Sequence, residues 1–248
     1  MTKYSAFGTS LGIGTRQVET ATIVGTITGD GDATVTVTAT GMTGTPIAIP
    51  VAVLDGDTAE EIAEKIRIKL ATVGNLTAKY EVGGSGIYVT LTALTALANV
   101  ADLNIAVEND TCTGITEDTT SDDTIAGVAN ATIAQIQEIS GAAHTLDTED
   151  VSTHDAIEVW EDVVSTVLRT GEVSFDIVYD PAETTHSATA GLLDYKENRK
   201  LAFFTLTFPD ATVWQFSGYV TGFEPDMPHD GALTAAVTVK ITGKPTLA

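Results

Sequence analysis

Two short acidic segments are the first candidates for binding chemistry. Asp30-Gly31-Asp32 and Asp55-Gly56-Asp57 each place two carboxylates two residues apart, as calcium-binding loops do. A calcium loop of the EF-hand type also needs further oxygen ligands at alternating positions and a closing glutamate, and neither segment supplies them. Turns and a helix start account for both, because Asp and Gly favour such positions. We therefore expect no metal and no cofactor at either segment.

The remaining reactive residue types lack the spacing that their reactions need. The glycine-rich residues 8–15 are not followed by the Gly-Lys-Ser/Thr of a phosphate-binding loop, and a mobile arm is expected there. No two histidines stand four residues apart, as on the helix of a zinc protease, although distant histidines could still converge. No Gly-x-Ser-x-Gly sequence marks a nucleophilic serine. The sequence therefore favours a structural or binding protein over a hydrolase. The four histidines are His144, His154, His186 and His229.

The charge of the chain argues against a protein that grips nucleic acid. Twelve basic residues oppose 34 acidic ones, for a net charge of −22, and no basic patch is present to displace counterions from phosphate. An acidic surface repels DNA, which would suit a conduit along which DNA slides. Acidity would equally keep a chain soluble before it assembles, and the composition does not separate these two interpretations.

Several features indicate a protein made in a reducing cytoplasm. The single cysteine, Cys112, excludes an intrachain disulfide and is expected to be a small buried side chain. The first residues lack the apolar segment of a secretory signal, and no apolar run approaches 18 residues.

The last third of the chain predicts antiparallel strands with one buried face. Residues 173–179 and 233–241 alternate apolar and polar side chains with a period of two. Asp180-Pro181, Pro209-Asp210 and Asp230-Gly231 are turn signals between such runs. A short flanking helix is expected over residues 187–200.

A Thr-, Ala- and Gly-rich segment, residues 20–127, reads as an inserted domain. Strands are expected at residues 33–40, 47–54, 76–82, 87–94 and 103–107, with Pro50 favouring a sheet edge for the second. A helix from about residue 58, with Asp57 as its N-cap, presents an apolar stripe at helical spacing. The segment therefore predicts a small ββαβββ domain that ends in an acidic linker, residues 117–123. The apolar stripe of the helix consists of Ala59, Ile62, Ala63, Ile66 and Leu70.

With the insert set aside, five phrases in order resemble the major tail tube protein of long-tailed, siphovirus-type bacteriophages. They are AFGTSLGIGT at residues 6–15, a strand at 133–139, DVSTHD at 150–155, GEVSFDI at 171–177, and the closing strands at 203–245. DVSTHD matches a usual D-V-T-T-x-D, whereas VVSTVLRTGE at 163–172 replaces a shorter phrase of the family. The resemblance covers about 138 residues in two pieces, and the discontinuous core domain is expected to comprise residues 1–19 and 128–248.

The resemblance implies a β-sandwich or barrel core that polymerises into a tube. Six copies would form a ring, and rings would stack head to tail into the conduit for phage DNA. It also implies tape measure, tail terminator and distal tail proteins as partners, a location in the virion tail, and an insert on the outside of the tube. The N-terminal arm and a long loop, residues 142–170, are the expected ring contacts. Candidate contact residues are Phe7, Leu11, Ile13, Asp147, Asp150, Val151, Thr153, His154, Asp155 and Trp160.

A second class of function stays open from the sequence. The Thr-rich strands of the insert would also suit a virion- or cell-surface adhesion module that binds host glycans.

Overall fold

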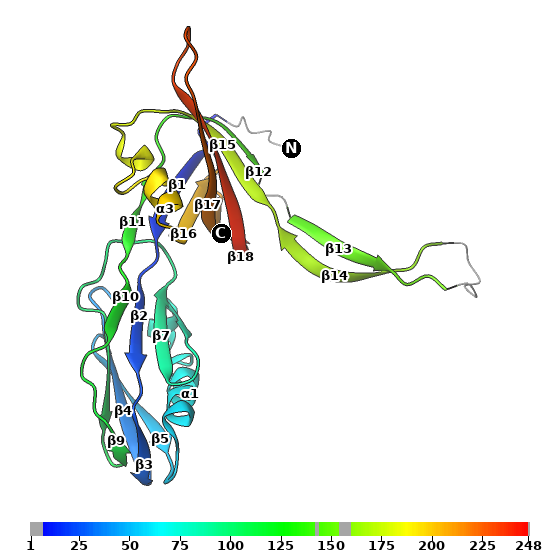
Figure 1. Cartoon of the computed structure of the whole chain (residues 1–248). Coiled ribbons are helices and arrows are strands. Elements are labelled where there is room, and N and C mark those ends of the chain that lie inside the picture. Colours follow the sequence, from blue (N-terminus) through cyan, green and yellow to red (C-terminus); the bar gives the residue numbers. More distant parts are fainter. Residues whose placement is uncertain (1–6, 142–143, 154–159, 248) are drawn as a thin grey trace. The chain divides into compact units, whose positions relative to one another are not determined.

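The protein is mainly β and divides into two compact units (Figure 1). A computed structural model describes residues 7–141, 144–153 and 160–247. The discontinuous unit comprises Met1–Ile13 and Ala131–Ala248, and the inserted unit comprises Gly14–Asn130. Antiparallel sheets with few helices confirm the predicted fold class. The inserted unit extends beyond residues 20–127 at both ends, and β2 (Val18–Thr22), which begins before that segment, pairs with β10 (Asp122–Ile125).

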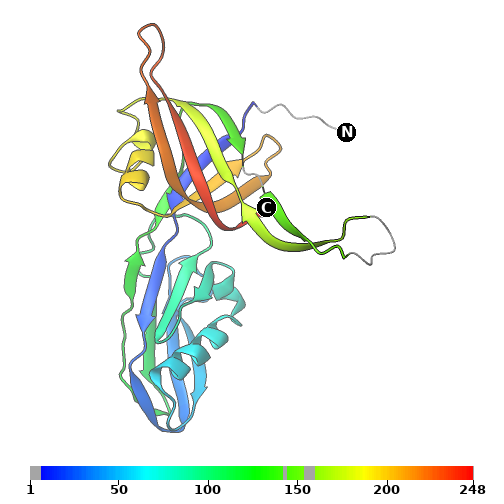
Figure 2. The same ribbon diagram turned by 45° about the vertical axis from the view of Figure 1, so that its right-hand side comes forward.

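A curled seven-stranded sheet forms the discontinuous unit (Figure 2). Its strand order is β11-β1-β16-β17-β18-β15-β12, and the neighbouring strands from β16 to β12 in this order pair antiparallel. The strands are β1 (Ser10–Thr15), β11 (Val128–Thr132), β12 (Ile136–Gly141), β15 (Glu172–Val178), β16 (Ala202–Thr207), β17 (Val213–Asp226) and β18 (Thr234–Leu247). A separate two-stranded ladder joins β13 (His144–Asp150) to β14 (Val163–Thr170).

The alternating runs of the last third bury one face, as predicted. Val173, Phe175 and Ile177 of β15 are buried, while Ser174 and Asp176 between them are exposed. The apolar residues of β18 from Ala235 to Ile241 lie in the same core. Two phenylalanines, Phe204 and Phe216, stack within it with ring centroids 5.4 Å apart. Period-two alternation is therefore a reliable signal here, because one face of the sheet meets a core and the other meets solvent.

The flanking helix is shorter than the predicted residues 187–200. A 3-10 turn, η1 (Thr184–His186), is followed by α3 (Leu192–Glu197). Asp194 ends the helix by accepting hydrogen bonds from Asn198 Nδ2 (2.7 Å) and Lys200 Nζ (2.7 Å). Gly191 cannot carry a Cβ, which would lie 2.5 Å from the Thr184 carbonyl oxygen, so the chain turns tightly before α3 begins.

The N-terminal arm and the strand at 133–139 were predicted incorrectly. Residues 10–15 form β1 instead of a mobile arm, because Leu11 and Ile13 supply buried side chains to the core. The second strand, β12, starts only at Ile136, because Gln135 has a positive φ of 57° that interrupts the extended run. Ile133 is nevertheless buried, and its amide donates to the Leu11 carbonyl oxygen at 2.8 Å.

The inserted unit contains the predicted ββαβββ order, framed by additional short strands. Its sheets have the orders β10-β2-β7-β6, β5-β4-β8 and β3-β9. Pro50 lies on β5, an edge strand, as its missing N–H requires. The elements are β2 (Val18–Thr22), β3 (Gly25–Gly29), β4 (Gly31–Thr38), β5 (Ile47–Val53), α1 (Ala59–Leu70), α2 (Gly74–Thr77), β6 (Tyr80–Gly83), β7 (Tyr88–Ala93), β8 (Asn104–Asn109), β9 (Thr113–Ile115) and β10 (Asp122–Ile125).

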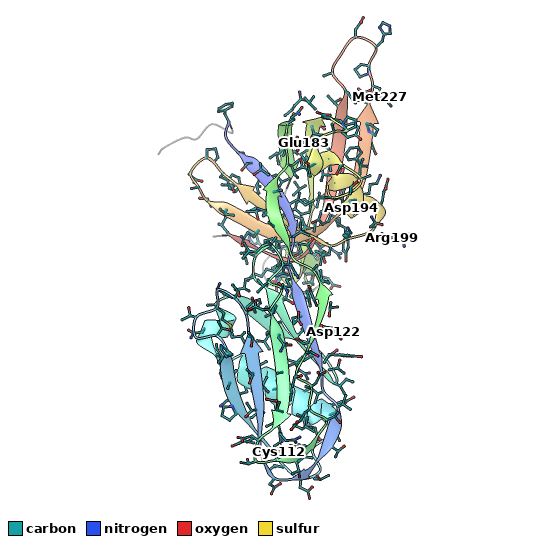
Figure 3. All side chains as sticks on the ribbon, turned by 90° about the vertical axis from the view of Figure 1, so that its left-hand side faces the viewer. Cys112, Asp122, Glu183, Asp194, Arg199 and Met227 are labelled. Atoms are coloured by element: carbon teal, nitrogen blue, oxygen red, sulfur yellow. The ribbon has the colours of Figure 1, made fainter. Side chains whose placement is uncertain are left out.

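Helix α1 starts one residue later than predicted. Thr58 is its N-cap and forms a capping box with Glu61, in which each side chain bonds the other's backbone amide. Asp57 instead accepts from the Leu54 amide (2.7 Å) and contacts Lys65, which together lower the pKa of Asp57. The predicted apolar stripe of the helix faces the core of the inserted unit, where Cys112 is also buried (Figure 3).

The acidic residues 117–123 are not a linker. Asp118 pairs with Val107 of β8 through two backbone hydrogen bonds of 2.7 and 3.0 Å, and β10 pairs with β2. Their polar sequence looks like a linker because β10 is exposed along its whole length. This segment closes the inserted unit before the chain leaves it.

Candidate assembly surface

The predicted long loop, residues 142–170, is instead an exposed β-hairpin in its described part. Strands β13 and β14 pair antiparallel from His144 opposite Thr170 to Asp150 opposite Val163, with a bulge between Leu146 and Thr148. The loop prediction was wrong, because β14, VVSTVLRT, is rich in β-branched residues, which favour strands. The hairpin extends from the sheet of the discontinuous unit in both ribbon views (Figures 1 and 2).

The hairpin and the sheet strands β12 and β15 share one continuous register. Gly141 pairs with Val173, and His144 pairs with Thr170, so three residues along one strand correspond to three residues along the other. Gly141 marks the change from sheet to hairpin, with a φ of +109°. A Cβ at this position would lie 2.2 Å from the Glu172 carbonyl oxygen. The junction therefore depends on a glycine at this place.

The base of the hairpin is fastened to the sheet. The Thr170 hydroxyl donates to the Ile241 carbonyl oxygen of β18 at 3.1 Å, and the Ile241 amide donates to the Gly171 carbonyl oxygen at 3.4 Å. The His144 ring meets the Trp214 ring edge to face, with centroids 5.4 Å apart. These contacts hold the first residue pair of the hairpin on β17 and β18.

Beyond its base, the hairpin exposes apolar side chains that no part of the described chain covers. Leu146 and Leu168 are cross-strand partners and are 52% and 75% exposed. An isolated two-stranded hairpin is marginally stable in water, since it has no core of its own. The exposed apolar residues of the hairpin are Leu146, Val151, Val163, Val164, Val167 and Leu168.

A groove of about 1090 Å³ lies beside the free edge of β12. Its walls include Phe7, Leu206, Phe208 and Trp214, so aromatic and aliphatic surface is open there. The edge of β12 has no strand on its outer side in the sheet order. Unpaired edges and apolar grooves are the features through which β proteins associate.

Of the three candidates in the N-terminal segment, Phe7 has the exposed side chain. Its side chain is 92% exposed, whereas Leu11 and Ile13 are core residues. Leu11 and Ile13 are apolar because they pack into the core of the sheet. Since both are buried within one copy, they are not surface contacts.

The candidates in and after β13 are exposed or make local contacts. Asp147 forms an ion pair with Arg169, and Asp150 accepts from the Ser152 amide at 2.8 Å. Hydrogen bonds from the Ser152 hydroxyl and amide lower the pKa of Asp150. Val151 and Thr153 are exposed.

Three candidates remain, and in the sequence they stand between β13 and β14. Trp160 is 83% exposed, while His154 and Asp155 lie outside the described residues. Sequence reasoning missed Leu146, Val164 and Leu168, because residues 142–170 were assigned to a loop. The β-branched residues of VVSTVLRT, which favour strands, could have identified β14.

The described residues offer little that resembles a reaction centre. Across residues 7–141, 144–153 and 160–247, no three His, Cys, Asp or Glu side chains group as metal ligands would. None of the described helices combines the length and the apolar character needed to cross a membrane.

The family model for the lambda phage tail tube protein matches residues 115–248, more than half of the chain. The chain belongs to the lambda phage tail tube protein family. It is a structural protein of the tail tube, and the resemblance found in the sequence is confirmed. The family match takes in the hairpin, α3 and the C-terminal strands of the sheet, and it begins inside β9 of the inserted unit.

Solved structures similar to this tail tube chain come from other particles. A chain of the native gene transfer agent virion is 16% identical, with a TM-score of 0.41, over 48% of this chain and 88% of that one. A chain from the tail of an empty gene transfer agent particle is also 16% identical, with a TM-score of 0.41, over 48% of this chain and 86% of that one. A chain of the anti-feeding prophage baseplate is 14% identical, with a TM-score of 0.38, over 48% of this chain and 83% of that one. No curated protein matches the sequence.

Proposed function

We propose that this tail tube protein assembles as rings, with six copies to a ring, that stack head to tail into the conduit for phage DNA. The proposal further holds that the chain has no enzymatic activity and is made in the host cytoplasm. It takes tape measure, tail terminator and distal tail proteins as its partners. The observation that carries it is the β13–β14 hairpin, whose apolar residues remain 43% to 75% exposed in the described part of the chain.

Stacking contacts are assigned to the hairpin and to Phe7. A head-to-tail contact joins two different surfaces, so an extended element on one copy needs a receiving surface on the next. The groove beside β12 offers apolar walls of the kind that Leu168 or Trp160 would fill. The net charge of −22 suits a tube that lets DNA pass without holding it.

Electron microscopy of the purified protein tests this function. Raising the protein concentration is expected to produce rings and then tubes of constant diameter, because exposed apolar surface becomes buried between copies. Averaged end views should show six-fold symmetry. Monomers that persist at every concentration and salt condition, together with binding to host glycans, would instead support the adhesion module.

The inserted unit is proposed to decorate the outside of the tube. We expect that excising Gly14–Asn130 leaves assembly intact. The cut is sterically reasonable, because the Leu11 carbonyl oxygen already accepts the Ile133 amide at 2.8 Å, so a short Gly-Ser linker can join the two sides. The measurement is tube formation by electron microscopy, beside the thermal unfolding of the shortened chain. A shortened chain that folds but stays monomeric would assign an assembly role to the inserted unit.

A further inference from the structure

A buried glutamate in the inserted unit has no function in the tube described above. Glu19, on β2, is 2% exposed, and its Oε2 atom has no hydrogen-bond partner among the residues that the structure describes. Its Oε1 atom lies 2.5 Å from the hydroxyl oxygen of Ser121, 102 residues further along the chain. Ser121 directly precedes β10, so this contact joins the second strand of the chain to the segment that closes the inserted unit.

The Ser121 hydroxyl lies within hydrogen-bond distance of two acceptor oxygens if Glu19 is ionised, but it has a single proton to donate. Ser121 Oγ accepts from the Ile105 amide at 2.9 Å, and it lies 3.1 Å from Asn104 Oδ1. Asn104 Oδ1 is an acceptor, because it already receives the Ser121 amide at 2.8 Å. A hydroxyl has one proton to donate. An ionised Glu19 would take that proton and leave two oxygens in contact at Asn104.

A proton on Glu19 satisfies every contact. The carboxylic acid then donates from Oε1 to Ser121 Oγ, and Ser121 donates to Asn104 Oδ1. The unpartnered Oε2 becomes the carbonyl oxygen of a neutral acid, which costs far less to bury than a carboxylate oxygen.

We propose that protonated Glu19 is a pH-sensitive latch that holds residues 118–125, the closing segment, on β2 and β8. Loss of the proton leaves a buried charge with an unmade hydrogen bond, and the closing segment loosens. The latch concerns the inserted unit alone and does not depend on the tube function proposed above.

The charges around Glu19 favour the neutral acid. Asp123 is its cross-strand partner on β10, and Asp122 is the next residue, so both charged neighbours on that strand repel a carboxylate. On the other side, β7 places Leu91 opposite Glu19. Burial and these two aspartates raise the pKa of Glu19, against the Ser121 hydrogen bond that lowers it.

The neighbouring elements β8 and the chain before β2 also carry charged side chains, Glu108 and Arg16. Glu108, the acid on β8, pairs in register with Thr34 of β4. Arg16, before β2, forms an ion pair with Glu81 of β6 at 3.9 Å.

The sign of the pH dependence follows from the direction of this shift. A carboxyl whose native pKa lies above its unfolded value binds its proton more tightly when the protein is folded. The stabilisation is complete below the unfolded pKa and is lost as pH rises through the native pKa. Asp57, Glu61 and Asp102 have lowered pKa values, so their contributions are lost only in more acidic solution.

Hydrogen exchange of the whole chain between pH 5 and pH 7 tests the latch. The inserted unit, Gly14–Asn130, contains no histidine, so few other groups titrate there in this range. We expect protection factors of the closing segment, corrected for intrinsic exchange, to fall by up to about tenfold per pH unit above the native pKa. Peptides of α1 serve as the internal reference.

Matched variants separate the latch from general effects of charge. Glu19→Gln keeps a neutral donor toward Ser121 and should make protection of the closing segment independent of pH. Glu64→Gln, on the exposed face of α1, removes one carboxylate elsewhere in the same unit and should leave the fall unchanged. A fall of equal size in wild type and Glu19→Gln would overturn the proposal.

A measurement on the wild type keeps the test independent of whether Glu19→Gln folds. Ordinary carboxyl groups lose their protons before Glu19 as pH rises, because the pKa of Glu19 is raised. The infrared carbonyl band of protonated carboxylic acids should therefore keep a last component that disappears over the pH range in which the closing segment loses protection. Loss of protection without the disappearance of such a component would refute the latch.

Discussion

A chain in which residues 145–169 are replaced by Asn-Gly is expected to fold and to remain monomeric. His144 and Thr170 are direct cross-strand partners, so a two-residue Asn-Gly turn can close the ladder at its base. The core of the discontinuous unit lies elsewhere, on β15 to β18, and loses no buried side chain. Thermal unfolding should stay close to wild type, while electron microscopy and light scattering should show no tubes. Tubes of normal length from this variant would assign stacking to another surface.

A single substitution within the hairpin gives a graded version of the same result. Leu168 is 75% exposed, and its burial between copies would contribute roughly 1.5–3 kcal/mol. Leu168→Ser should therefore raise the protein concentration needed for tube formation by roughly tenfold to a hundredfold, with little change in monomer stability. Ile68→Ser is the matched control, since Ile68 is 62% exposed on α1 of the inserted unit, whose removal is expected to leave assembly intact. Equal effects of both substitutions would mean that assembly responds to general hydrophobicity.

The sequence predicts those strands whose two faces meet different surroundings. β15 and β18 alternate because one face packs into the core, and α1 shows its stripe for the same reason. β13 and β14 are exposed on both faces, so no alternation toward a core distinguishes them from a loop. Under the proposed function, neighbouring copies of the chain would cover their apolar residues. The sequence therefore singles out this segment as a candidate surface, which stays a prediction, but it does not predict the hairpin form.

Long-range pairing explains the other failures. Residues 117–123 read as a linker because the partners that make them structural, Val107 and Glu19, stand far away in the sequence. The glycine-rich residues 8–15 looked mobile for the same reason, although Leu11 and Ile13 complete a core made of residues beyond 130. Glycine and aspartate patterns report local flexibility, and tertiary contacts override them.

Replacing Gly141 by alanine is expected to disrupt assembly through the geometry of the hairpin. Gly141 has a φ of +109°, a region that side chains rarely adopt, and an added Cβ would lie 2.2 Å from the Glu172 carbonyl oxygen. Backbone strain and the clash together should cost roughly 3 kcal/mol. Because the register is continuous across this residue, the chain can relieve the clash only by opening the junction between β12 and β15. The hairpin then loses the orientation that stacking needs.

Gly243→Ala separates the clash from the backbone strain. Gly243 also has a positive φ, of +72°, but a Cβ there would meet no atom within 4 Å. Its replacement should lower stability by about 1 kcal/mol and leave tube formation intact. The comparison uses chemical denaturation for stability and electron microscopy for tubes. Since the two substitutions add the same methyl group to the same sheet, loss of tubes in Gly141→Ala alone would tie assembly to the direction in which the hairpin leaves the sheet. Tubes formed equally well by both variants would contradict that link.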